Sequence, residues 1–356
     1  MKILVAIYSP FACWCIPDDQ VQWLRREFPE HIFVRADSDA QTLERIADAD
    51  VVFGATVRPD QLAAARRLRW IHSPAAGIGN MLFPEMVASP VVMTNSRGNS
   101  AVTMAEHVIA VTLALLRDLP LAWRRQAERK WAQDEFNAGA RVRLLRDCRV
   151  LIVGFGSIGR ETGRLMSALG ATVVGIRKNA LPTSNSELPV PDSQVAGDLG
   201  VEEFVLGSVP LGVVELGVVE LGVGSLRAEL ALADVVVIAA PQTNETMHMI
   251  GEAELASMKP GAVLVNVSRG KLVDEVALAR ALETGRLRGV ALDVFEHEPL
   301  APASPFWARE DVLITPHVSG FQSRHWHDAA AIFAENLRRF EAGQELLNPV
   351  NKAAGY

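Results

Sequence analysis

Short apolar runs recur through the first hundred residues and alternate with polar or periodic stretches. The runs read ILVAI, IFVRA, VVFGA, LRWIHS and VVMTN, and stretches such as DAQTLERIADA and RPDQLAAARRL separate them. Apolar strands that alternate with helical segments predict a parallel sheet covered by helices. The first part of the chain is therefore expected to be an α/β domain.

A second series of the same kind begins at residue 149. It reads RVLIVGFGSIG and continues through ATVVGI, ADVVVIAAP, GAVLVNVS, GVALDVF and DVLITPH. A long helix over Ser100 to Arg117 and a Trp- and Arg-rich stretch precede it, and one amphipathic helix with a tail follows it. Because 356 residues exceed what one hydrophobic core usually holds, two domains are expected.

Two segments need separate interpretations. The start of the chain imitates a short signal peptide, but Pro10 and the Asp18-Asp19 pair favour a first strand over Lys2 to Tyr8. Between residues 198 and 225 the dipeptide Leu-Gly recurs, and LGVVELGVVELGVG repeats every five residues. That period matches neither strand nor helix. We expect an expanded surface loop there; a flap or an interface hairpin is the alternative.

Charge and cysteine content narrow the classes of partner. A formal charge of -7 and a pI near 5.7 disfavour a nucleic-acid or anionic-membrane surface. No apolar run approaches the roughly 20 residues of a membrane span. Three cysteines are too few and too unevenly placed for a disulfide framework, and no second pair completes a zinc site with Cys13 and Cys15. The sequence thus predicts a cytoplasmic protein without a bound metal.

The turn GFGSIG follows the strand RVLIV and opens a helical pattern, which is the context of a dinucleotide site. Glycines allow the tight turn and the approach of a pyrophosphate, and the helix N-terminus offers free N–H groups. The predicted cofactor contacts are Gly154, Phe155, Gly156, Ser157, Ile158 and Gly159. The alternative is a glycine-rich turn that binds nothing.

Arg177 decides which nucleotide is expected. It lies 18 residues after Gly159, near the end of the second strand, where an NAD site carries an acid for the ribose 2′-hydroxyl. A guanidinium there, followed by Lys178, suits a 2′-phosphate instead. NADP(H) is therefore the preferred cofactor and NAD(H) a possible one, with a solvated surface cation as the alternative role of Arg177.

Three polar residues follow later strands of the second series. Arg269 lies in NVSRGKLVDE, Glu298 in LDVFEHEPL and His317 in ITPHVSG. Since the carboxyl ends of parallel strands border the ligand crevice, these residues can converge despite spacings of 29 and 19. Singly, each has an ordinary structural explanation as a turn cap, a loop acid or a structural histidine.

Together, the four ordered motifs GFGSIG, NVSRG with LVDE, LDVFEHEP and TPH with VSG resemble the D-isomer-specific 2-hydroxyacid dehydrogenase family, in its glyoxylate/hydroxypyruvate reductase-like branch. The resemblance covers nearly the whole chain. It implies NAD(P)H-dependent reduction of a small 2-keto acid to the D-2-hydroxy acid by hydride transfer. His317 would be the proton donor, Glu298 would orient its imidazole, and Arg269 would bind the carboxylate and the carbonyl oxygen.

The resemblance also implies further contacts and an architecture. Cofactor contacts would come from Pro241, Val267, Ser268 and Asp293, and substrate contacts from the backbone of Ala76 and Gly77 in HSPAAGIG. The family architecture is two Rossmann-like or flavodoxin-like doubly wound domains with the active site in the cleft between them. Residues 1–100 and 319–356 would form the substrate domain and residues 101–318 the dinucleotide-binding domain.

Assembly and function keep alternatives. Family members are usually homodimers joined through the cofactor domain, and the helix Ser100 to Arg117 with its Trp-rich arm suits that role, although a core helix is the competing explanation. A cofactor-sensing scaffold of the corepressor type is the rival from another functional class. Oxidation of formate is a third reading, less favoured because the formate branch commonly pairs its histidine with glutamine.

Overall fold

The computed structural model describes residues 1–138, 142–177, 217–220, 223–353 and 355. Clustering of contacts divides them into two compact units. Unit 1 comprises residues 1–103, 241–243 and 320–356, and unit 2 comprises residues 104–240 and 244–319. No helix in the described part of the chain is long and apolar enough to span a membrane.

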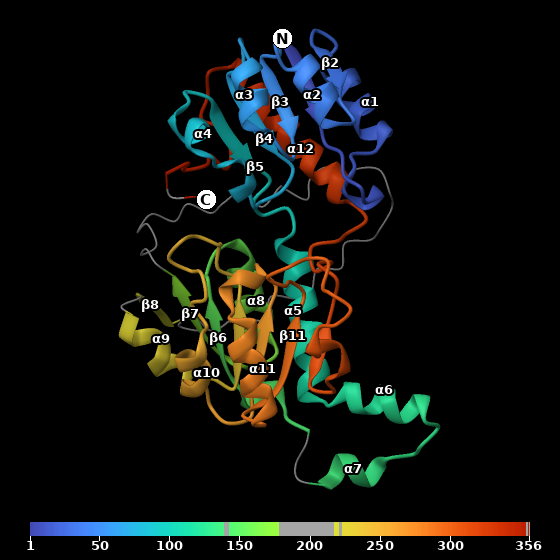
Figure 1. Ribbon diagram of the computed structural model, residues 1–356, viewed down its shortest axis with the longest axis vertical. Helices are drawn as coiled ribbons and strands as arrows, with labels where there is room; N and C mark the ends of the chain where they lie inside the picture. Colours follow the sequence, from blue (N-terminus) through green and yellow to red (C-terminus); the bar gives the residue numbers. More distant parts are fainter. Residues whose placement is uncertain (139–141, 178–216, 221–222, 354, 356) are drawn as a thin grey trace, which may run out of the picture. The chain divides into compact units, whose positions relative to one another are not determined.

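Unit 1 is a parallel sheet with helices on both faces (Figure 1). The strand order is β2-β1-β3-β4-β5, a doubly wound order of the flavodoxin-like kind. Its elements are β1 (Lys2–Ala6), α1 (Asp18–Glu27), β2 (Ile32–Arg35), α2 (Asp39–Arg45), β3 (Val51–Gly54), α3 (Pro59–Ala64), β4 (Trp70–Ser73), α4 (Pro84–Ala88), β5 (Val92–Asn95) and α12 (His325–Glu341).

Unit 2 is a larger parallel sheet with the order β12-β11-β10-β9-β6-β7-β8, so the order reverses between β9 and β6. Its elements are α5 (Ala101–Leu116, which begins in unit 1), α6 (Leu119–Ala127), α7 (Gln133–Asn137), β6 (Arg149–Val153), α8 (Ser157–Ala168), β7 (Thr172–Arg177), β8 (Gly217–Glu220), α9 (Val223–Leu230), β9 (Val235–Ile238), α10 (Glu252–Ser257), β10 (Ala262–Asn266), α11 (Glu275–Glu283), β11 (Leu287–Leu292) and β12 (Val312–Ile314). The predicted pair of parallel α/β sheets is confirmed.

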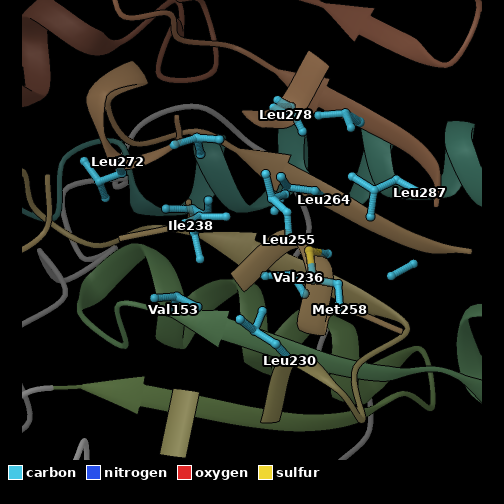
Figure 2. Packing of buried hydrophobic residues seen from close by; sticks show 14 of the residues in the cluster. Val153, Leu230, Val236, Ile238, Leu255, Met258, Leu264, Leu272, Leu278 and Leu287 are labelled. Carbon is cyan, nitrogen blue, oxygen red and sulfur yellow. The ribbon is translucent and has the colours of Figure 1, made fainter. Parts of the chain in front are cut away.

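Alternation of side chains along the strands builds two cores on the faces of the unit 2 sheet. Val236 and Ile238 belong to one core, and Val235 and Val237 to the other, all with 0% exposure. The first core includes side chains of α9, α10 and α11, and Figure 2 shows Ile238 and Val236 within it. The second includes side chains of α5 and α8. Because the strands are buried on both faces, they read in the sequence as continuous apolar runs.

Part of the five-residue repeat belongs to the sheet. Gly217–Glu220 forms β8, which pairs with β7 in parallel register, Arg177 opposite Glu220. The expectation of a surface loop is therefore wrong for this stretch, because paired valines supply a β-strand signal that the repeat period masks. Residues 178–216 and 221–222 lie outside the described residues, and the first of them is Lys178, a predicted cofactor contact.

Candidate active site

The glycine turn between β6 and α8 lies at the point where the strand order reverses. Gly154 has φ +98°, and a Cβ there would lie 2.3 Å from the backbone nitrogen of Ala240. A Cβ on Gly159 would lie 2.2 Å from the carbonyl oxygen of Gly154. A Cβ on Gly156 would meet nothing within 4 Å. Two of the glycines thus close the turn, and the middle one leaves open space above it, as phosphate approach requires.

The N-terminus of α8 faces that open space without a side-chain cap. Its N-cap is Gly156, and the first backbone bond of the helix runs from the N–H of Arg160 to the carbonyl of Gly156. Among the described residues, the N–H groups of Ser157, Ile158 and Gly159 have no hydrogen-bond partner. A helix N-terminus with free donors binds anions, so these residues fit the pyrophosphate of a dinucleotide.

Phe155 contributes differently from its neighbours in the turn. Its side chain is 3% exposed and belongs to the core beneath the sheet. Its ring fills the space left by two glycines, because a Cβ on Gly175 would lie 2.3 Å from the ring and a Cβ on Gly163 would lie 3.2 Å from it. The aromatic side chain therefore packs inward, and only the backbone of Phe155 belongs to the surface of the turn.

The other predicted cofactor residues follow neighbouring strands. Arg177 is the last residue of β7 and is partly exposed. Val267 and Ser268 follow β10, and the hydroxyl of Ser268 donates to the carbonyl of Ala240 after β9. Pro241 comes next in the chain and is exposed, and it clusters with unit 1.

His317 and Glu298 form a hydrogen-bonded pair. Nδ1 of His317 lies 2.7 Å from Oε2 of Glu298, while Oε1 accepts from the backbone N–H of Phe295 at 2.9 Å. Both carboxylate oxygens are thus engaged. Nε2 of His317 has no hydrogen-bond partner in the described part of the chain. With Nδ1 directed at the carboxylate, Nε2 is the ring atom available for proton exchange.

Arg269 is brought beside this pair by an unusually close approach of two loops. A Cβ on Gly270 would lie 1.8 Å from the backbone carbon of Phe295, so only glycine allows the loop after β10 to meet the loop after β11. Asn266 shapes the turn: its Nδ2 donates to the carbonyl of Arg269 at 3.1 Å, and its Oδ1 accepts from the N–H of Ser268 at 3.1 Å. The three predicted catalytic residues therefore converge within unit 2.

Charges within this cluster act on one another. Burial opposes ionisation of Glu298, but the hydrogen bond with His317, the N–H of Phe295 and the charge of Arg269 hold the pKa of this carboxyl below its ordinary value. Desolvation lowers the pKa of the Arg269 guanidinium, and the negative charge of Glu298 opposes that shift. At neutral pH the site therefore holds an ionised carboxylate between an imidazole and a guanidinium.

Asp293 organises the loop that carries His317. It is 1% exposed, and its carboxylate accepts from the hydroxyl of Thr315 at 2.6 Å and from the N–H groups of Val318 and Ser319 at 2.9 and 3.0 Å. The backbone of His317 has φ 55°, a left-handed conformation that ordinary residues avoid. Asp293 therefore holds a strained loop, a role that the sequence did not indicate.

In unit 1 the loop after β4 contains Ala76 and Gly77, the predicted substrate contacts. Both residues are exposed, and Nδ2 of Asn95 donates to the carbonyl of Ala76 at 2.8 Å. A separate pocket of about 500 Å³ in unit 1 has an aromatic wall that includes Trp14 and Phe321, whose rings lie 4.6 Å apart.

Some supporting residues were missed in the sequence. Asn95 is the last residue of β5 and Asn266 is the last residue of β10, just as Arg269 and His317 lie shortly after the ends of their strands. A polar residue at the carboxyl end of a parallel strand indicates a position near the ligand site, so both asparagines could have been found in the sequence. Thr315 stands two residues before His317 within the TPH motif and has no signal of its own.

Comparisons with known proteins agree with this geometry. The model of the D-isomer specific 2-hydroxyacid dehydrogenase NAD-binding domain matches residues 109–211 and 205–319, which confirms the prediction of a nicotinamide dinucleotide cofactor. A D-isomer specific 2-hydroxyacid dehydrogenase from Xanthobacter autotrophicus, solved in complex with NADPH and MES, is similar with a TM-score of 0.78 and 26% identity. That similarity covers 100% of this chain and 99% of the other.

Two curated relatives differ in their substrates and lengths. A glyoxylate reductase of Korarchaeum cryptofilum is 32% identical over 319 residues, 87% of this chain and 85% of the relative. A D-3-phosphoglycerate dehydrogenase of Mycobacterium tuberculosis is 31% identical over 310 residues, 87% of this chain and 52% of the relative. The chain thus spans about half the length of such phosphoglycerate dehydrogenases. On the family match and these identities, the chain belongs to the D-isomer-specific 2-hydroxyacid dehydrogenase family.

Proposed function

We propose that this protein reduces a small 2-keto acid of the glyoxylate or hydroxypyruvate type to the D-2-hydroxy acid, with NADPH preferred over NADH. The observation that carries the proposal is the His317–Glu298 pair at 2.7 Å with Arg269 beside it. The pair lies in the same unit as the open glycine turn. An imidazole with one free nitrogen next to a guanidinium suits proton delivery to a bound carbonyl.

Each residue has a distinct task in this reaction. The bound cofactor supplies the hydride. Nε2 of His317 gives a proton to the carbonyl oxygen, and Glu298 keeps the imidazole oriented through Nδ1. Arg269 binds the substrate carboxylate and the carbonyl oxygen through its planar fork, and the N–H groups of the Ala76–Gly77 loop add donors to the carboxylate.

Cofactor preference is assigned to the end of β7. Arg177 would meet the 2′-phosphate there, and charge-assisted bonds of about 1.5–3 kcal/mol correspond to roughly a ten- to a hundred-fold preference for NADPH. Val267, Ser268 and Pro241 would line the cofactor, and Asp293 would stand near the carboxamide while it holds the His317 loop.

We also propose a cytoplasmic homodimer joined through the dinucleotide-binding domain. The arm formed by α6 and the following turn exposes large apolar side chains, with Trp131 90% exposed and Trp123 53% exposed. Exposed aromatic residues of this size are typical of surfaces that contact another chain. Light scattering of the purified protein tests this assignment, and a monomer across the micromolar range would contradict it.

The function is tested with a substrate panel run with both cofactors. Glyoxylate, hydroxypyruvate, pyruvate and phenylpyruvate are assayed with NADPH and NADH, and formate and D-3-phosphoglycerate with the oxidised cofactors. We expect the highest kcat/KM for glyoxylate or hydroxypyruvate with NADPH. Turnover confined to D-3-phosphoglycerate or formate would move the assignment to that substrate. No turnover at all would favour the cofactor-sensing scaffold.

Two variants assign the roles of the residues. His317→Ala should lower kcat at least about 10²-fold with NADPH binding nearly unchanged, because general acid catalysis contributes about that much. Arg177→Asp should weaken NADPH selectively and spare NADH. Arg227→Asp, which changes another exposed arginine of unit 2, serves as the matched control and should leave the ratio unchanged. Equal losses for both cofactors in Arg177→Asp would remove it from the 2′-phosphate site.

A further inference from the structure

A directed chain of buried hydrogen bonds runs through unit 1 toward the Ala76–Gly77 loop. Nε1 of Trp70 donates to Oγ1 of Thr94 at 2.8 Å, and that oxygen lies 2.7 Å from Nδ1 of His72. Nε2 of His72 lies 3.1 Å from Oγ of Ser96, which donates to the carbonyl of Ser73 at 3.2 Å. Because the hydroxyl of Ser96 has one hydrogen and donates it to the carbonyl of Ser73, its oxygen must accept from Nε2 of His72, and the chain ends at the last residue of β4.

Burial and hydrogen bonding together keep His72 as the neutral tautomer with its hydrogen on Nε2. Nδ1 of His72 accepts from the hydroxyl of Thr94, and Nε2 carries the hydrogen. Burial, with 0% exposure, lowers the pKa of His72 to about 3, so the ring stays neutral across the physiological range. The support under the loop therefore does not change with pH.

Asn95 extends this support from β5 to the loop itself. Its Nδ2 donates to the carbonyl of Ala76 at 2.8 Å, and its Oδ1 accepts from the N–H of Arg97 at 3.2 Å. Its own N–H donates to the carbonyl of Asn348 at 3.3 Å. With 4% exposure, the side chain is held at both ends and cannot reorient without breaking these bonds.

Because the peptide group is planar, the hydrogen bond from Asn95 also fixes the direction of the Gly77 N–H. In a trans peptide the carbonyl of Ala76 and the N–H of Gly77 share one plane and point in opposite directions. Since Asn95 holds the carbonyl from the buried side, the N–H of Gly77 points away from the interior. Among the described residues, neither that N–H nor the N–H of Ala76 has a hydrogen-bond partner.

The C-terminal segment holds Asn95 in turn. Asn336 of α12 donates to the carbonyl of Leu347 at 3.0 Å and accepts from its N–H at 2.6 Å. Nδ2 of Asn348 donates to the carbonyl of Arg97 at 2.9 Å, and the N–H of Val350 donates to the carbonyl of Met93 at 2.9 Å. The segment after α12 is thus attached along β5, directly behind the strand end that carries Asn95.

We propose that Asn95 is a positioning residue for substrate binding, which fixes the Ala76–Gly77 peptide so that its N–H faces the substrate carboxylate, with the C-terminal segment as its support. The inference rests on the proposed function, because it requires a carboxylate at that loop. It adds a specific cause for the orientation of the loop and a role for residues about 250 positions away in the sequence.

Two substitutions of Asn95 test the proposal. Asn95→Asp keeps the shape but sets a carboxylate oxygen against the carbonyl of Ala76, so the peptide must turn away. Asn95→Ser removes the bond without adding charge. We expect KM for the keto acid and the inhibition constant of oxalate to rise about 3- to 10-fold in the serine variant and at least about 10-fold in the aspartate variant. In both variants kcat should stay within about twofold, with NADPH affinity unchanged.

Thr42→Val is the matched control. Thr42 is fully buried in unit 1 and donates to the carbonyl of Ser38 at 2.9 Å, so its loss perturbs the unit without touching the loop. The control should lower the midpoint of thermal unfolding and leave KM unchanged. A folded Asn95→Ser variant with an unchanged KM would overturn the proposal. A fall in kcat together with a rise in KM in all three variants would also overturn it. The wild-type protein is assayed before the variants. If it reduces no keto acid, the proposed function itself has failed, whatever the role of Asn95.

Discussion

Replacing Asp293 by asparagine tests whether the His317 loop is held by charge. The two side chains have the same shape, so the amide oxygen can still accept from the hydroxyl of Thr315 and the N–H of Val318. The amide nitrogen must then face the N–H of Ser319, which is 2% exposed. Two charge-assisted bonds become neutral ones, and one buried donor loses its acceptor.

The expected cost follows from those contacts. The weakened bonds and the unpaired N–H together correspond to about 3–5 kcal/mol of unfolding free energy, a large share of the stability of a typical domain. Because His317 has φ 55° in this loop, its backbone should relax toward an ordinary conformation once the carboxylate is gone. A displacement of about 1 Å at a catalytic group can cost about 10²-fold, so we expect kcat to fall at least about 10-fold.

The effect should also depend on pH in a defined direction. Burial alone would raise the pKa of Asp293, but hydrogen bonds from Ser319, Thr315 and Val318 hold it below its ordinary value. A carboxyl whose folded pKa is lowered stabilises the protein fully above its unfolded pKa of about 3.9 and loses that contribution as the pH falls through the folded value. The difference in stability between wild type and variant should therefore be constant near neutrality and narrow only below about pH 4.

Urea unfolding followed by tryptophan fluorescence, together with steady-state kinetics, provides the assay. Asp274→Asn is the matched control, because Asp274 accepts from the N–H groups of Val276 and Ala277, both at 2.9 Å, at the start of α11. Asparagine is an equally good N-cap, so the control should change stability by less than about 0.5 kcal/mol. If Asp293→Asn behaved like this control, with kcat changed less than threefold, the argument for a charge-held loop would be refuted.

Two further predictions concern the loops around the catalytic pair. Gly270→Ala should lower kcat at least about 10²-fold and lower the unfolding midpoint, because its Cβ would overlap the backbone of Phe295. Gly285→Ala is the control, because Gly285 has φ +66° and open space around it. This variant should cost only about 1 kcal/mol of stability and leave kcat unchanged. Glu298→Gln should lower kcat roughly 10-fold, because a neutral amide replaces the carboxylate at Nδ1 of His317, and circular dichroism should show an unchanged fold. Equal kinetics of the two glycine variants, or full activity of Glu298→Gln, would contradict these expectations.

Most of the fold could be predicted from local patterns in the sequence. Both parallel sheets could be predicted because each strand is buried on two faces and therefore reads as an unbroken apolar run, as β9 does with 0% exposure at Val235–Ile238. The sheet position of Gly217–Glu220 was missed because its pairing with β7 depends on partners far along the chain and not on its five-residue period. The glycine turn was predicted, but the inward packing of Phe155 depends on Gly175, which is 20 residues away.

The candidate site divides in the same way. Arg269, Glu298 and His317 were selected by their order and motifs, and the 2.7 Å contact of the last two agrees with that choice. Residues that hold the site by buried hydrogen bonds, such as Asn95, have no motif because their partners come from distant segments. Such contacts exist only after folding, so sequence reasoning finds the chemistry before it finds the supports.

The inward ring of Phe155 has a consequence for how nucleotide preference can evolve. The shape of the glycine turn depends on the ring of Phe155, which packs in the core between α8 and β7 against Gly163 and Gly175. The side chain assigned to the 2′-phosphate stands two residues further on, at the tip of the strand and outside the core. On that assignment, natural or laboratory selection can exchange residue 177 to change the nucleotide used while the binding turn itself is inherited intact.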